Sequence, residues 1–230
     1  MSDADARQFV IRSHTWHETD RDFKNDLASL LKTDLAKAES FCAEYFDKFY
    51  LVHQVGHVIL QLFNTKDPAT PARGEYLANL FAVKYFEYKR EGDYIDKMAH
   101  CMAVLTKAYR AEFDFDIEQM NQYHERCKTD IVALAAWHFN AFLSSRRSTH
   151  KLAQVMAHMS RGQLATINSG ILPRRGIGGQ TLLQECLVTV FEMNGIMPDI
   201  RLEYCPSLAL ENFALEVLST EQRPSEAASG

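Results

Sequence analysis

Apolar residues recur every three or four positions over most of the chain, the spacing that places them on one face of an α-helix. From residue 20 onward this pattern predicts two helices that meet near 33–34, the second of which runs to about Leu62. A third helix is expected over 71–89, because Thr70 followed by Pro71 is typical of a helix start. The first part of the chain is therefore predicted to be helical.

The rest of the chain repeats this spacing and adds one clear loop. Residues 168–179 hold four of the ten glycines and are expected to form that loop. Around it the pattern predicts a helix over 94–109, one that is capped by Asp114 or Asp116 and ends by about Ser145, and three more over 148–167, 181–194 and 208–219.

These elements predict an all-α fold, a single compact domain of about seven to eight helices. No internal repeat and no long linker divides the sequence, so we assign 19–220 to one helical domain, with a subdivision near 128 as the weaker alternative. Residues 1–18 are polar and are expected to form an irregular N-terminal arm. Residues 221–230 are small and polar and are expected to be disordered.

The composition and charge of the chain argue against several classes of protein. With 25 Lys and Arg against 30 Asp and Glu, the net charge of −5 argues against a nucleic-acid partner, which needs clustered positive charge. No apolar stretch approaches the roughly 18 residues of a membrane span. Five cysteines without a CxxC pair, and no signal peptide, predict a cytoplasmic protein with reduced thiols. Nothing in the sequence sets the oligomeric state, and a homodimer stays open.

One pair of histidines stands out as candidate chemistry. His53 and His57 lie four residues apart on a predicted helix, so both imidazoles project from one face and can share a metal ion. The next helix begins after a turn and would bring Glu75 alongside them as an oxygen ligand. Asn79 follows one turn later, where it can hydrogen-bond a ligand. Two histidines and one carboxylate are a recurring ligand set for zinc and for non-heme iron.

An alternative to the metal site stays open, because both histidines lie in an apolar helix. They could be core residues that are hydrogen-bonded to other side chains, although burial of a half-satisfied histidine is costly. Gly56, between them, would let another backbone or a substrate approach closely, at about 1 kcal/mol of helix stability relative to alanine.

The same residues resemble a known family. The run from Phe49 to Leu60 that contains His53-Gln54-Val55-Gly56-His57, followed by Glu75-Tyr76-Leu77-Ala78-Asn79-Leu80-Phe81-Ala82, is similar to the ImmA/IrrE family of zinc-metallopeptidase-like proteins. That family combines HExxH in one helix with ExxANxFA in the next. The resemblance covers about residues 45–90, and it implies His53, His57 and Glu75 as the ligands of a metallopeptidase-like centre.

The chain departs from this family at the position that carries the catalysis. In HExxH peptidases the glutamate takes a proton from the metal-bound water, and here the residue is Gln54. A carboxamide can position water or substrate but cannot accept a proton near neutral pH, and loss of base assistance typically lowers the rate by about 10²- to 10⁴-fold. We therefore do not expect ordinary peptidase activity.

A second, looser similarity points to another class of chemistry. Ubiquinone-biosynthesis proteins carry HDxxH and a downstream Gly-Glu, comparable with His53, His57 and Gly74-Glu75 here, and their metal serves redox or decarboxylation chemistry. This chain again has glutamine in place of the acidic residue, and its gap between His57 and Glu75 is longer than in that family.

Several other side chains are weaker candidates. His100, His124 and His138 lie on further predicted helices, and His138, in the most apolar of them, is the best candidate for an additional catalytic group or ligand. Arg174 and Arg175, in the glycine-rich loop, are candidates for contact with an anion or a substrate.

The sequence thus favours an enzyme that uses one divalent transition metal, zinc or iron. The first interpretation is a metal-binding protein that resembles metallopeptidases but lacks their base, with a small-molecule or peptide substrate. The alternatives are a metal-dependent oxidase, oxygenase or decarboxylase acting on a small apolar molecule, and a binding or regulatory module without catalysis.

Overall fold

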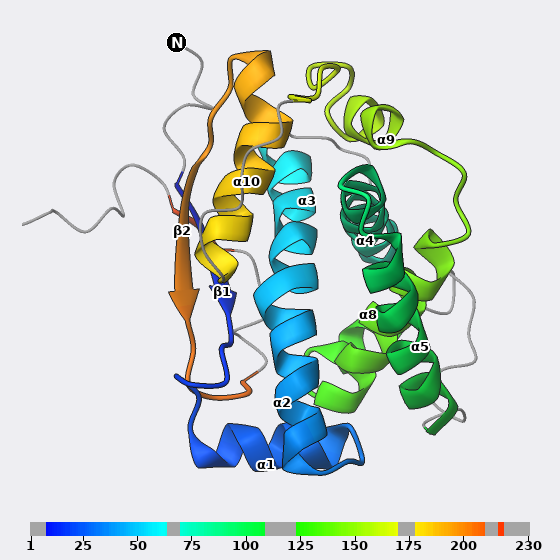
Figure 1. Cartoon of the computed structure of the whole chain (residues 1–230), viewed down its shortest axis with the longest axis vertical. Helices are drawn as coiled ribbons and strands as arrows, with labels where there is room; N and C mark the ends of the chain where they lie inside the picture. Colours follow the sequence, from blue (N-terminus) through cyan, green and yellow to red (C-terminus); the bar gives the residue numbers. More distant parts are fainter. Residues whose placement is uncertain (1–7, 64–69, 109–122, 170–177, 210–215, 219–230) are drawn as a thin grey trace, which may run out of the picture.

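A computed structural model describes residues 8–63, 70–108, 123–169, 178–209 and 216–218. The predicted mainly helical, single compact domain is confirmed (Figure 1). The helices whose bounds lie within these ranges are α1 (Arg21–Leu30), α2 (Leu35–Glu44), α3 (Tyr50–Leu62), α4 (Pro71–Tyr88), α5 (Gly92–Ala108), α8 (Ile131–Ser145), α9 (Leu152–Met159) and α10 (Gly179–Phe191), and residues 123–127 are helical as well.

The long helix expected to end near Leu62 is interrupted by one π-helical segment. Helix α2 passes into a π-helical turn, Tyr45–Phe49, which leads directly into α3. Such insertions are rare and often mark functional sites. Helix α3 lies at the centre of the molecule and is almost wholly buried, with α10 on one side and α4 on the other (Figure 1).

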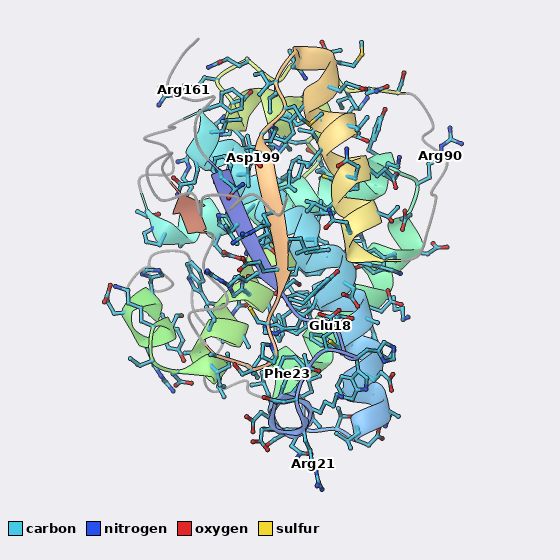
Figure 2. The ribbon with its side chains drawn as sticks, turned by 90° about the vertical axis from the view of Figure 1, so that its left-hand side faces the viewer. Glu18, Arg21, Phe23, Arg90, Arg161 and Asp199 are labelled. Carbon is cyan, nitrogen blue, oxygen red and sulfur yellow. The ribbon has the colours of Figure 1, made fainter. Side chains whose placement is uncertain are left out.

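The expected N-terminal arm is wrong for residues 8–13, which form a central strand. Strand β1 (Gln8–Ser13) pairs in parallel with β2 (Asp199–Tyr204) and antiparallel with β3 (Glu216–Leu218), so the sheet order is β2-β1-β3. Figure 2 shows β1 and β2 side by side in front of the helices. The pairing joins residues about 190 positions apart, so no local pattern in either segment announces it.

Three predicted helices also differ from the structure. The helix expected to run to Ser145 is interrupted before Asp130, whose carboxylate accepts the backbone N–H groups of Val132 and Ala133 and begins α8 there. The helix predicted over 148–167 is only the eight residues of α9, and Arg161 and Gly162 beyond it have positive φ. The last predicted helix contains β3 instead. Asp114, Asp116 and the tail 221–230 lie outside the described residues.

Candidate metal centre

Two imidazoles on α3 form the centre of the candidate site. His53 is 1% exposed, whereas the His57 side chain is 26% exposed at the edge of the site. The one-turn spacing brings their Nε2 atoms to 3.1 Å from each other. The opposite nitrogen of His53, Nδ1, has no hydrogen-bond partner in the described part of the chain. The polar contacts of this ring are therefore on its Nε2 side.

Helix α4 supplies a carboxylate to the same point. Glu75 is 2% exposed, and its Oε1 lies 3.4 Å from His53 Nε2 while its Oε2 lies 3.3 Å from His57 Nε2. Asn79, one turn later, donates from Nδ2 to Oε1 at 2.7 Å and to the backbone oxygen of Glu75 at 2.9 Å. The amide fixes the carboxylate rotamer, as an outer partner of a metal ligand does.

The packing of α3 on α4 explains why these side chains meet. A Cβ placed on Gly56 would lie 2.8 Å from the Cα and 3.1 Å from the carbonyl oxygen of Ala78. The two backbones therefore touch at a point between the two histidines and one turn beyond Glu75. Thr70 accepts a backbone N–H at the start of α4, and Pro71 occupies its first turn, so the helix begins where the sequence predicts.

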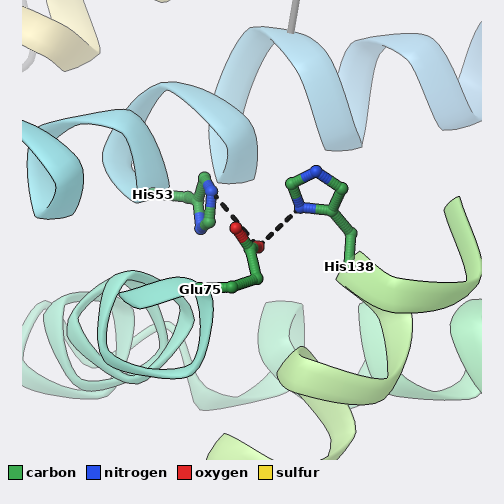
Figure 3. Close-up of side chains that lie close together, drawn as sticks. All are labelled: His53, Glu75 and His138. Atoms are coloured by element: carbon green, nitrogen blue, oxygen red, sulfur yellow. Dashed lines mark ion pairs between the residues drawn. The ribbon is translucent and has the colours of Figure 1, made fainter. Parts of the chain in front are cut away.

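Helix α8 adds a fourth side chain, and the glutamate lies between two imidazoles in Figure 3. His138 Nδ1 lies 2.5 Å from Glu75 Oε1. His53, Glu75 and His138 are all buried and each offers one ligand atom, all within 4.8 Å of one another. The structure therefore contains a buried group of two histidines and one glutamate that could hold a metal ion. His57 contacts two members of this group.

The electrostatics of the cluster suit a cation. Burial lowers the pKa of His53 to about 3, although Glu75 opposes the shift, so this imidazole is neutral and can offer a lone pair. Burial also opposes ionisation of Glu75, but the imidazoles of His138 and His53 outweigh it and hold its pKa well below 4.5. A buried carboxylate is costly without a positive charge beside it, and either a metal ion or a protonated imidazole can supply that charge here.

The distances also suit an ion. Two ligand atoms that each lie about 2.0–2.2 Å from a tetrahedral metal are about 3.3–3.6 Å apart. His53 Nε2 lies 3.4 Å from Glu75 Oε1 and His57 Nε2 lies 3.3 Å from Glu75 Oε2, both within that range, and the 3.1 Å between the two imidazoles is slightly shorter. The 2.5 Å between His138 Nδ1 and Glu75 Oε1 is too short for two ligands of one ion and is a hydrogen-bond distance. The side chains of His53, His57 and Glu75 therefore fit one small divalent cation.

Gln54 is buried beside this cluster without the role of a base. The residue is 2% exposed, and its Oε1 has no hydrogen-bond partner among the described residues. The preceding turn carries Tyr50, whose pKa is raised by burial and by Glu75, with the Gln54 side chain as a hydrogen-bond partner that opposes the shift. Gln54 thus faces Tyr50, and its free oxygen can accept a hydrogen bond.

The remaining candidates are placed as follows. His100 is exposed on α5, and His124 is partly exposed and stacks near Trp137, so neither belongs to the cluster. Arg174 and Arg175 lie outside the described residues. No local pattern in the sequence predicts that His138 contacts Glu75, because this contact depends on how α8 packs on α4 in the fold.

An apolar cavity borders the cluster on the side of α8. It measures about 30 Å³, and its lining includes Leu31, Phe41, Tyr45, Ala135 and His138. His138 is therefore shared by the cavity wall and the polar cluster.

Comparison with known proteins does not assign the chain. No family model, no curated protein and no solved structure matches it. Among the described residues, no helix is long and apolar enough to cross a membrane. The function of this chain is therefore inferred from the geometry of the site.

Proposed function

We propose that this chain is a metalloenzyme that binds one divalent transition metal, zinc or iron, through His53, His57 and Glu75, with His138 against the carboxylate of Glu75 beside the metal. The observation that carries the proposal is the convergence of three imidazole nitrogens on one buried, ionised carboxylate. Core histidines that only satisfy one another would not need a buried negative charge at their centre. The predicted resemblance to gluzincin-like centres names the same first three residues.

We further propose that the chemistry is oxidation or decarboxylation of a small apolar molecule and that the metal is iron. Gln54 stands where a peptidase needs a base, and its buried amide cannot take a proton from water. A two-histidine, one-carboxylate set with open positions suits iron-dependent oxygen chemistry. When bound, such a metal supplies electrons and Lewis acidity. Because His53, Glu75 and Gln54 are almost wholly buried, the cluster favours a small molecule over a peptide as substrate.

Metal analysis of protein purified without an affinity tag tests the metal site. We expect about one equivalent of metal in the wild type. We expect almost none in His53→Ala and Glu75→Gln, because each variant removes a buried ligand. His100→Ala is the matched control, since this histidine is exposed on α5 and outside the cluster. Metal-free wild type, or full occupancy in both site variants, would contradict the proposal.

A further inference from the structure

The cavity beside His138 has a defined chemical character. Of the described residues that line it, only Tyr45 and His138 carry a polar side-chain atom, and the others are aliphatic or phenylalanine. A buried water needs two to four polar partners, so these walls favour an apolar occupant over water. Leu30 and Leu134, from α1 and α8, line the cavity while partly exposed, so it approaches the surface between these helices.

The size of the cavity limits what it can hold. A volume of about 30 Å³ is room for roughly two water-sized spheres. Apolar cavities that bind a benzene ring are about 150 Å³, several times larger. In this conformation the space therefore fits a small apolar molecule of two or three atoms and excludes a ring.

The position of the cavity connects it with the proposed metal centre. The ring of His138 lines the space, and Nδ1 of the same ring lies 2.5 Å from Glu75 Oε1. The apolar walls thus end at the first polar group of the cluster. Tyr45, also on the wall, lies in the π-helical turn next to α3. His138 is therefore common to the cavity wall and the cluster.

We infer that this cavity holds dioxygen and delivers it to the metal centre past His138. The inference rests on the proposed function, because dioxygen is the apolar diatomic molecule that an iron oxidase or oxygenase consumes. Leu30 and Leu134 form the entrance, and Ala135 and Leu31 set the free volume. Binding of an apolar probe to the cavity is tested in the metal-free protein. A negative result for the cavity can therefore be told apart from a negative result for metal binding.

Xenon is the probe for the first test, because it is apolar, small and visible by ¹²⁹Xe NMR. Saturable xenon binding to the metal-free wild type is expected. Ala135→Leu fills the cavity and should abolish binding, whereas Leu31→Ala enlarges it and should strengthen binding. Ala43→Leu is the matched control, because Ala43 is exposed on α2 and does not line the space. Absence of saturable binding in both the wild type and Leu31→Ala overturns the inference.

The second test measures the oxidation of iron. The protein is loaded with Fe(II) under anaerobic conditions and is then mixed with dioxygen. Each Fe(II) gives one electron to one dioxygen molecule, which becomes superoxide, and the Fe(III) that forms is detected by its absorbance. Ala135→Leu should slow this oxidation severalfold and Leu31→Ala should not, with iron affinity unchanged in both. Equal oxidation rates in Ala135→Leu and wild type overturn the inference and leave the metal centre standing. Loss of iron binding in the wild type, with xenon still bound, overturns the proposed function instead.

Discussion

The contact between Gly56 and Ala78 makes the sharpest prediction about how the site is built. A Cβ at position 56 would lie 2.8 Å from Ala78 Cα and 3.2 Å from Ala78 Cβ. Carbon atoms prefer separations of about 3.5–4.0 Å, so Gly56→Ala must push α4 away by roughly 0.7–1.2 Å. Glu75 is carried by the same helix, one turn before Ala78, and moves with it.

The cost of this displacement falls mainly on metal binding. Overpacking typically costs about 1–3 kcal/mol, while alanine stabilises a helix interior by about 1 kcal/mol relative to glycine. The net loss of unfolding free energy is therefore at most about 2 kcal/mol. Ligand distances, in contrast, must hold to about 0.2 Å. We expect metal affinity to fall by about 10- to 100-fold, the range found when the outer support of a metal site is disturbed.

Titration of the metal-free protein with Co²⁺, together with urea unfolding, measures both quantities. Gly92→Ala is the control, because a Cβ there meets nothing within 4 Å at the exposed start of α5. It should bind Co²⁺ as the wild type does. If Gly56→Ala also binds Co²⁺ with wild-type affinity, the close approach of α3 and α4 does not position the ligands.

Two further substitutions test charge in the core. Gln54→Glu introduces a carboxylate at a buried position near Glu75. We expect no peptidase activity in the zinc-loaded variant and a loss of about 1–3 kcal/mol in unfolding free energy. Peptide hydrolysis by this variant would show that the site is a disarmed peptidase. Burial raises the pKa of Asp47 to about 6, although a hydrogen bond from Thr15 opposes the shift. The folded chain therefore binds this proton more tightly than the unfolded chain, whose pKa is near 3.8, and the unfolding free energy falls as pH rises from about 4 to 6. Asp47→Asn should raise the urea midpoint at pH 7.5 by the equivalent of about 1 kcal/mol or less, after allowance for the partial exposure of the carboxyl group, and not at pH 4; equal midpoints for the variant and the wild type at pH 7.5 would contradict this assignment.

Local signals in the sequence were sufficient to predict a helix where its own residues set its start and its buried face. The helix predicted over 71–89 is α4, Pro71–Tyr88, because Thr70 caps it and its apolar residues follow the helical period. The break before Asp130 had a signal of the same kind, an aspartate directly before an apolar run. The helical spacing of apolar residues before and after Asp130 made the two segments look like one continuous helix. The position of a helix boundary is thus predictable when the cap is weighed above the pattern.

Non-local contacts account for what the sequence could not predict. Phe9, Val10 and Ile11 are completely buried in β1, yet a three-residue apolar run between polar residues predicts no particular partner. Its partner strand β2 lies at the other end of the chain. The residues of the candidate site also fall into a part that local sequence predicts and a part that it does not. His53, His57 and Glu75 follow from two consecutive helices, whereas the contact of His138 with Glu75 depends on how α8 packs across α4.

Positions 54 and 138 connect the packing of these helices with the proposed function. In HExxH peptidases the proton acceptor follows the first histidine on the same helix, and the residue there in this chain is Gln54, whose amide cannot accept a proton near neutral pH. His138 brings an imidazole to the Glu75 carboxylate from a different helix, with its Nδ1 2.5 Å from Oε1. Its ring also lines the apolar cavity, where Gln54 is not a lining residue. If the proposed function holds, we therefore expect the reaction on the side of Glu75 that faces His138 and the cavity, and not through a water activated by the residue after His53.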